Sequence, residues 1–303
     1  MNRRKFISNT SLSLLGLSMY KTGNSMSSLS FQGNKKIIVG AHVWVYAAKQ
    51  PGYDVSPILS QIFSDVAYAG LDGVETMENP LRSPVYTKQI KELIDQYKIK
   101  LIGTSYSGQM WNKDLHNKIF EDVDNIFTNM ASVGGKTFGV TVGEPKGREK
   151  TDEDFDNQAN LLKKIISLGK EKGIVLNLHN HTGEVKNNMY DLRGTLKRIP
   201  DIGLGPDLNW LLRAGINPLE FLREFRKQIV FLHLRDQLSN GKWPESMGEG
   251  NVNFKEIADV LKEINFSGQT IIELAHENGF VPTRPLKESL KMSRDYMRKT
   301  MGI

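Results

Sequence analysis

The chain has 303 residues, of which 39% are hydrophobic and 24% are charged, and it contains no cysteine. This composition is ordinary for a globular protein and excludes a disulfide-stapled scaffold, a collagen-like fibre and a wholly disordered chain. The formal net charge is +6, but the first 25 positions hold four basic residues and no acidic one, so the rest of the chain is close to neutral and gives no electrostatic basis for binding nucleic acid.

The N-terminal segment resembles an export signal. Arg3, Arg4 and Lys5 precede a weakly apolar stretch, residues 12–19, in which Leu and Met alternate with Ser and Gly. An arginine pair before such a stretch is typical of a twin-arginine signal, whereas the alternative is a disordered or amphipathic tail. No run of about 18 apolar residues predicts a transmembrane anchor. We predict an export signal and linker in residues 1–33, and a periplasmic or otherwise extracytoplasmic protein with no stable membrane anchor after signal removal.

Eight short apolar runs follow and predict eight buried parallel strands. They cover residues 37–39, 73–75, 101–103, 138–142, 174–178, 202–204, 229–232 and 270–272. The intervening segments predict helices near residues 58–69, 90–97, 119–130, 155–168, 190–199, 219–225, 257–264 and 286–301. Because no Gly-x-Gly-x-x-Gly motif follows the first run, we predict an α/β fold with a single (β/α)8 TIM barrel in residues 34–303 rather than a doubly wound sheet.

Polar side chains gather directly after these runs, where the loops of a barrel form its open face. They include His42, Trp44, Glu75, Ser105, Tyr106, Glu144, His179, His181, Asp207, His233, Arg235, Glu273 and His276. Five of the six histidines of the chain belong to this set. The concentration predicts an active site at the C-terminal ends of the strands.

Four of these residues, which follow four successive runs, predict a metal site: His179, Asp207, His233 and Glu273. Two imidazoles and two carboxylates suit one divalent Mn, Co, Zn or Fe ion, and four protein ligands leave positions open for substrate oxygens. The alternative is that the histidines are structural and the acids cap neighbouring helices. Acids left unpaired at buried strand ends are costly, which favours the metal site.

At these residues the chain resembles the xylose isomerase-like TIM-barrel superfamily, which includes sugar isomerases, ketose 3-epimerases, inosose dehydratases and endonuclease IV-type enzymes. The resemblance extends over about residues 36–300 and rests on segments 178–181, 203–207, 233–236, 248–254 and 272–273. In the family's epimerases Glu, Asp, His and Glu hold the metal, and the two glutamates carry protons. Here His179 stands at the first glutamate position and Trp210 at a position usually held by histidine.

The resemblance implies a divalent-metal-dependent isomerase or epimerase that removes a proton beside a metal-chelated carbonyl of a sugar or keto sugar. Glu273 is the first choice of base, Glu144 or Glu75 the second acid–base group, and His181 a proton donor or a structural neighbour of His179. The predicted substrate-binding residues are Arg235, Trp210, Glu75, His42 and Trp44. Arg235 is expected to contact substrate oxygens or to pair with Asp236, and Trp210 to stack on a sugar ring.

Two alternatives remain beside this prediction. Subfamilies with the same His-Asn-His segment resemble enzymes of oxidised sugars, so His179 favours a lyase or dehydratase that performs β-elimination on a 3-keto-glycoside. A non-catalytic exported sugar-binding barrel is the other, although the complete ligand set weighs against it. The endonuclease activity is disfavoured because Trp210 stands at a ligand position. The expected partner is a small sugar and not nucleic acid, and a homo-oligomer remains open.

Overall fold

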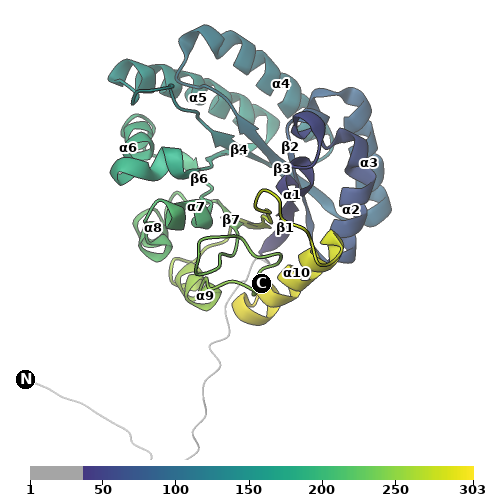
Figure 1. The fold of residues 1–303 in the computed structure, drawn as a ribbon. Coiled ribbons are helices and arrows are strands. Elements are labelled where there is room, and N and C mark those ends of the chain that lie inside the picture. The colour runs from purple at the N-terminus through teal and green to yellow at the C-terminus, as the bar shows by residue number, and fades with distance from the viewer. Residues whose placement is uncertain (1–36) are drawn as a thin grey trace, which may run out of the picture. The chain divides into compact units, whose positions relative to one another are not determined.

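The computed structural model describes residues 37–303 and forms a nearly closed barrel of eight parallel strands, which confirms the predicted fold (Figure 1). The strands are β1 (Ile38–His42), β2 (Gly73–Met77), β3 (Lys100–Ser107), β4 (Thr137–Thr141), β5 (Val175–Leu178), β6 (Gly203–Leu204), β7 (Phe231–Leu234) and β8 (Gln269–Ile272). They are hydrogen-bonded in the order β6-β5-β4-β3-β2-β1-β8-β7. Isolated bridges from Leu204 to Ile229 and from Asp207 to His233 link β6 to β7. The predicted signal and linker, residues 1–33, lie outside the described residues.

Helices surround the strands in a ring (Figure 1). They are α1 (Trp44–Ala47), α2 (Leu59–Tyr68), α3 (Pro84–Tyr97), α4 (His116–Ser132), α5 (Asp152–Lys172), α6 (Thr182–Arg198), α7 (Leu208–Arg213), α8 (Pro218–Glu224), α9 (Phe254–Glu263) and α10 (Leu286–Met301). Four short 3-10 helices, at Pro51–Tyr53, Ser56–Ile58, Asn79–Arg82 and Lys113–Leu115, lie in the connections. Within the described residues, no helix is long and apolar enough to cross a bilayer.

The predicted helices all occur, but α6 begins earlier than its sequence pattern indicates. Its first turn ends in residues 186–189, where Asn187, Asn188 and Met189 have φ angles of 50°, 56° and 60°. This left-handed interruption breaks the helical periodicity, so the pattern predicts only the part that follows it. The helices α1 and α7 are too short for periodicity to reveal them.

Apolar side chains fill the inside of the barrel below the polar strand ends. Ile102, Phe231 and Ile271 form a buried cluster, against which Ile38 and Val230 pack. Because β3 and β7 are not neighbours in the sheet, their side chains meet inside the barrel. A second, larger core lies between the strands and the helices. Polar groups therefore have one open end of the barrel in which to gather.

The start of α5 carries a testable contribution to stability. Thr151 accepts a hydrogen bond from the backbone N–H of Asp154, and the Asp154 carboxylate accepts from the Thr151 N–H and from Arg148. The bond to Arg148, opposed by burial, lowers the pKa of Asp154 from 3.8 to about 2. Since the pKa is depressed in the folded state, the contribution is present above about pH 4 and is lost as the pH falls towards 2.

We expect Asp154→Ala to lower the free energy of unfolding by about 1 kcal/mol at pH 7, because the carboxylate loses its bonds to the Thr151 N–H and to Arg148 while the Thr151 cap remains. Urea unfolding at pH 7 and at pH 2.5 measures this difference, which should shrink at the lower pH. Glu153→Ala, in the same helical turn, is the control. A loss that is the same at both pH values would show that the ionised carboxylate is not its source.

Candidate active site

A cavity of about 320 Å³ opens where the strands end. Its lining includes eight of the site residues predicted from the sequence, namely His42, Trp44, His179, His181, Trp210, His233, Arg235 and Glu273. Further lining residues come from β2, β3, β4 and the loops after β7 and β8. The size suits a small-molecule ligand, with apolar walls and a few converging polar groups.

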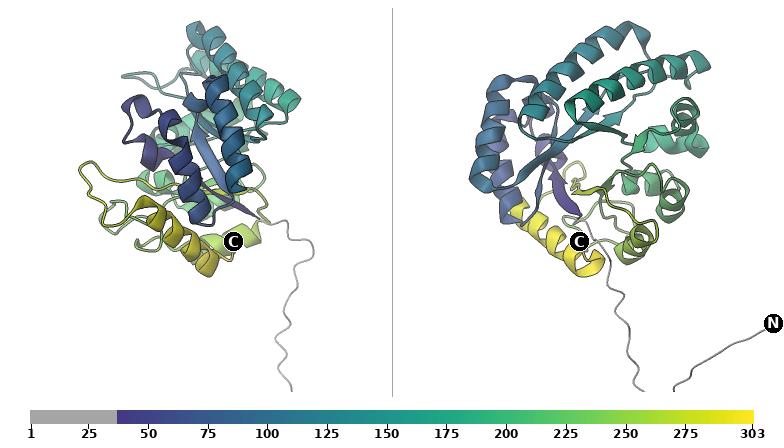
Figure 2. Two further views of the ribbon diagram at one scale, coloured as in Figure 1. Left: turned by 90° about the vertical axis from the view of Figure 1, so that its right-hand side faces the viewer. Right: turned by 180° about the vertical axis from the view of Figure 1, so that it is seen from behind.

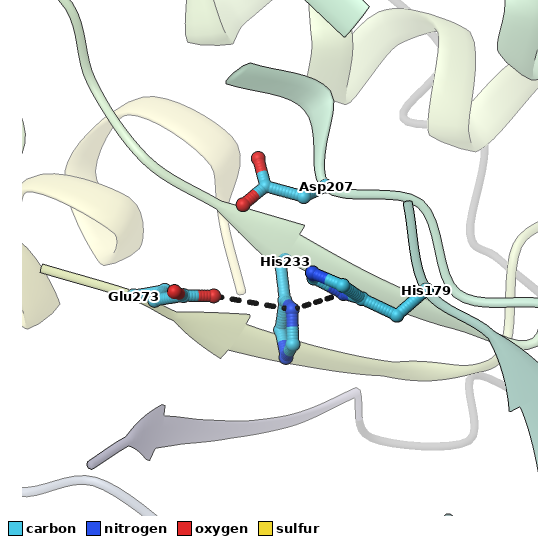
Figure 3. A group of neighbouring side chains, drawn as sticks. All are labelled: His179, Asp207, His233 and Glu273. Atoms are coloured by element: carbon cyan, nitrogen blue, oxygen red, sulfur yellow. Dashed lines mark hydrogen bonds and ion pairs between the residues drawn. The ribbon is translucent and has the colours of Figure 1, made fainter. Parts of the chain in front are cut away.

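The four predicted metal ligands lie close together (Figure 3), and His179, His233 and Glu273 also line this cavity. One ligand atom from each of His179, Asp207, His233 and Glu273 can be chosen so that all four lie within 4.8 Å of one another, and all four residues are buried. The Nδ1 atoms of His179 and His233 are 2.9 Å apart. Successive strand ends lie side by side around a barrel, so β5 to β8 deliver these groups to one place.

Glu75 fixes the orientation of the His233 ring from below. Its Oε2 lies 2.5 Å from Nε2 of His233, and the Glu75 side chain is completely buried within β2. A proton on Nε2 directed at this carboxylate leaves the lone pair of Nδ1 pointing into the cluster. Histidines that bind metals usually have such a carboxylate behind them. The predicted substrate contact of Glu75 is not seen, because Glu75 lies beneath the cavity and does not line it.

Asp207 is held by the end of β5 and by the start of α7. The side-chain amide of Asn180 exchanges two hydrogen bonds with the Asp207 backbone, at 3.3 and 3.2 Å. Oδ1 of Asp207 caps α7 by accepting from the backbone N–H groups of Asn209 and Trp210. The helix cap considered as an alternative therefore exists, but it uses one oxygen and leaves Oδ2 directed at the cluster.

Arg235 lies between the two carboxylates of the cluster. Its Nη2 donates to Oε1 of Glu273 and lies 3.3 Å from Oδ2 of Asp207. Of the two alternatives predicted for Arg235, the pairing with Asp236 does not occur, because Asp236 accepts hydrogen bonds from backbone N–H groups that include those of Gly248 and Gly250. The glycine-rich segment 248–254 thus anchors the loop after β7. A Cβ atom at Gly250 would lie 2.2 Å from Oδ1 of Asp236, so this position requires glycine.

The donor set fits a divalent cation. Oε2 of Glu273 is buried, has no hydrogen-bond partner among residues 37–303, and lies 3.2 Å from Nδ1 of His233. Two electron-pair donors that face each other in a buried site are stabilised by a cation between them. The nitrogen and oxygen ligands match Mn, Co, Zn or Fe rather than Ca or a thiolate-binding metal.

Burial and mutual charge shift the pKa values of the cluster. Burial lowers the pKa of His179 well below its usual value, and it raises the pKa of Asp207. Burial also opposes ionisation of Glu273, but the charge of Arg235 outweighs it and lowers the pKa of that carboxyl. Burial disfavours a charged His233 ring, yet the charge and hydrogen bond of Glu75 raise its pKa to about 9, so a cation that binds to Nδ1 would displace a proton from it. The site thus favours an ionised carboxylate at Glu273 and a neutral imidazole at His179.

We expect Glu75→Gln to weaken the binding of a divalent ion by about 10- to 100-fold, since the carboxylate behind the His233 ring is lost. Titration of the metal-free protein with Mn²⁺ or Zn²⁺, followed by calorimetry, measures the change. Glu78→Gln is the matched control, because Glu78 lines the cavity but pairs with Arg82, 3.6 Å away, outside the cluster. Equal effects of both variants would contradict the role given to Glu75.

Aromatic side chains form two walls of the cavity. The rings of Trp210 and Trp243 lie 5.8 Å apart, and the guanidinium carbon of Arg235 is 5.6 Å and 4.8 Å from their respective ring centroids. On the other side, Trp44 packs against Tyr53 with ring centroids 5.3 Å apart. Trp rings beside a polar cluster suit the apolar face of a sugar ring.

The other predicted site residues, His42, His181 and Glu144, lie in three different surroundings. His42 accepts from the Trp44 backbone N–H at Nδ1 and is 2.9 Å from Oγ of Ser105 at Nε2, so it serves to fix the wall. His181 is exposed at the start of α6, with its ring centroid 5.1 Å from that of His179. Glu144 pairs with Lys186 at 2.8 Å and lines a separate, smaller pocket, so it is not brought to the cluster.

Several lining residues were not singled out by the sequence, among them Ala48, Met77, Glu78, Ser107 and Thr141. Except for the carboxylate of Glu78, their residue types carry no chemical signal, and the extent of β2, β3 and β4 was the signal that could have indicated those at the strand ends. His276 and Trp243, which the sequence places in loops after β8 and β7, also line the cavity.

Comparisons with known proteins agree with the fold. Residues 63–299 match the model of a family described as xylose isomerase-like TIM barrel. The chain is 22% identical over 311 residues to an inosose dehydratase of Clostridium perfringens, covering 90% of this chain and 100% of that protein. Among solved structures, D-allulose 3-epimerase from Methylomonas sp. has a TM-score of 0.69 at 15% identity, covering 88% of this chain and 98% of the other. A 3-keto-D-glucoside 4-epimerase from E. coli has a TM-score of 0.64 at 16% identity, covering 87% and 100%.

Proposed function

Because the chain belongs to the xylose isomerase-like TIM barrel family, we propose that this protein is a divalent-metal-dependent sugar isomerase or epimerase. It would act beside the carbonyl of a sugar or keto sugar. The observation that carries the proposal is the buried convergence of His179, Asp207, His233 and Glu273, of which all but Asp207 line the cavity. The names of the relatives, an inosose dehydratase and two sugar epimerases, support a sugar-modifying enzyme.

These four residues would hold one Mn, Co, Zn or Fe ion, which as a Lewis acid would polarise the substrate carbonyl. Arg235 is positioned to donate hydrogen bonds to substrate oxygens beside Glu273 and Asp207. Trp210 and Trp243 would bind the sugar ring and exclude water from it. Of the acid–base groups predicted from the sequence, Glu273 and His181 line the cavity.

A lyase or dehydratase is the second candidate, and His179 favours it. In the family's epimerases this position holds a glutamate that carries a proton, whereas a neutral imidazole ligand leaves one carboxylate fewer. The similarity to inosose dehydratase supports the same activity. β-Elimination needs one base and a polarised carbonyl, and a symmetrical pair of bases is not required.

Deuterium incorporation tests the proposal. We would purify the protein, determine metal per chain by elemental analysis, and follow by NMR the exchange of the C–H beside the carbonyl in D₂O for ketoses, inososes and 3-keto-glycosides. The expected result is about one metal per chain, with exchange that chelation abolishes and added metal restores. Release of water or of the aglycone would identify the lyase. Sugar binding without exchange at any metal occupancy would instead support the non-catalytic barrel.

We also propose that the protein works outside the cytoplasm. The support is the pattern of Arg3 and Arg4 before a weakly apolar stretch. Replacing both with lysine should retain the protein in the cytoplasm of a bacterium that has a twin-arginine translocase, as measured by cell fractionation. Unchanged export of the double variant would contradict the twin-arginine pathway.

A further inference from the structure

The loop between β8 and α10 brings another histidine to the cavity. His276 lies three residues after Glu273 and lines the same space. Its ring packs on Phe280, with centroids 4.5 Å apart and planes inclined by 31°. Figure 2 shows, in its side view, the olive segment that leads into α10 standing out from the barrel. The segment belongs to the rim of the barrel, and the packing on Phe280 holds the His276 ring in its place on this segment.

Both ring nitrogens of His276 are buried and have no hydrogen-bond partner within residues 37–303. The three buried histidines differ: His42 is bonded at both nitrogens, and His179 and His233 face each other in the cluster. Buried polar groups in folded proteins nearly always have partners. A ring with two free nitrogens on a cavity wall is therefore suited to a partner that enters the cavity.

Two of the other predicted proton carriers, Glu273 and Glu144, already have partners in the protein. Oε1 of Glu273 accepts from Arg235, and Oε2 faces His233. Glu144 is paired with Lys186 in a neighbouring pocket. Of the acid–base groups that line the cavity, His181 is exposed to solvent, and His276 is the half-buried one that neither the cluster nor the protein framework uses.

The surroundings of His276 favour a neutral ring. Burial lowers its pKa, the charge of Lys49 adds to this, and Glu245 opposes it. Neutral imidazole accepts a proton directly at physiological pH, and general bases are most effective when their pKa lies near that pH.

We propose that His276 is the general base of the reaction, an inference that rests on the function proposed above. The C–H bond beside the carbonyl breaks, its proton passes to a ring nitrogen of neutral His276, and the electron pair stays on the substrate as the carbonyl oxygen becomes an enolate oxygen. In isomerisation, the imidazolium returns the proton to the neighbouring carbon of the enediolate, while the hydroxyl proton passes to the enolate oxygen and the carbonyl re-forms on the other carbon. In elimination, the electron pair of the enolate forms a C=C bond as the C–O bond to the leaving group breaks, and the imidazolium gives its proton to the departing oxygen. Either return restores the neutral ring. Glu273 remains a metal ligand in this scheme.

The test compares His276→Gln with His116→Gln. His116 begins α4, is bonded to the Met110 carbonyl at 2.9 Å and does not line the cavity, so its variant controls for the loss of a histidine elsewhere. We expect His276→Gln to slow carbon-bound deuterium exchange by at least about a hundredfold. Its metal content and the substrate affinity seen by tryptophan fluorescence should stay unchanged. Added imidazole should restore part of the exchange in His276→Gly, which also serves if the glutamine variant does not fold.

The outcomes separate this inference from the proposed function. Exchange by His276→Gln within threefold of wild type, with metal bound, overturns the role of His276 and leaves the proposed function standing. A change in KM alone, with kcat unaffected, makes His276 a binding residue and overturns the inference as well. Wild-type protein that holds metal but exchanges no sugar in the panel overturns the proposed function and this inference together.

Discussion

Removal of the His233 imidazole is expected to abolish metal binding. His233 contacts His179, Glu273 and Glu75 at once, so His233→Ala removes one ligand and leaves the others without their common neighbour. We expect the affinity for Mn²⁺ or Zn²⁺ to fall by more than about a hundredfold, which is the upper end of the cost of losing an outer partner alone. Elemental analysis after gel filtration should find about one metal per chain in wild type and none in the variant.

The control for this prediction concerns Glu75, whose carboxylate loses its partner when His233 is replaced by alanine. Glu75 is completely buried, and without the ring its charge has no partner, which by itself destabilises the fold. The double variant His233→Ala/Glu75→Gln removes that charge and should be more stable than His233→Ala while still binding no metal. Metal bound by either variant as tightly as by wild type would contradict the assignment of the ligand set.

The fold and the four-residue cluster could be predicted because they depend on repetition. Eight alternations of strand and helix specify the barrel, and the barrel topology then brings the residues after β5, β6, β7 and β8 together without any knowledge of side-chain packing. Inspection of the few residues that follow each predicted strand is enough to identify such a cluster.

The roles of Glu75 and Glu144 could not be predicted from strand order, because each role depends on the exact residue at which a strand ends. The apolar run at residues 73–75 makes Glu75 look like a strand end, but β2 continues to Met77, so Glu75 lies inside the barrel beneath His233. Glu144 follows Gly143, whose φ of 71° turns the chain, and the carboxylate reaches Lys186. The glycine was the available signal, since only a glycine adopts such a turn without strain.

The sequence shows His276 as a histidine near a strand end. The role proposed for it, however, depends on the lack of a hydrogen-bond partner for its ring nitrogens among residues 37–303. The free ring nitrogens follow from the packing of the loop between β8 and α10 on Phe280. No periodicity or spacing describes that loop. Roles that rest on an unpaired atom therefore require coordinates, whereas roles that rest on residue type and strand order do not.

The buried ion pair between Lys150 and Asp191 gives the largest expected effect on stability. Lys150 lies in the loop before α5 and Asp191 in α6, and their side chains are 2% and 9% exposed. Burial lowers the pKa of Lys150 and raises that of Asp191, so neither charge is tolerated without the other. We expect Asp191→Leu to lower the free energy of unfolding by about 3 to 5 kcal/mol, because it leaves the Lys150 ammonium buried and unpaired.

The double variant Lys150→Met/Asp191→Leu should recover most of that loss, since two apolar side chains can replace a buried pair at little cost. Urea unfolding of the wild type, the two single variants and the double variant gives the coupling between the residues. Glu92→Gln is the matched control, because the pair of Glu92 with Lys88 is 66% and 80% exposed and its loss should change stability by less than about 1 kcal/mol. If the double variant is no more stable than Asp191→Leu, the loss of stability does not come from an unpaired Lys150 charge, and side-chain packing between α6 and the loop before α5 is its source.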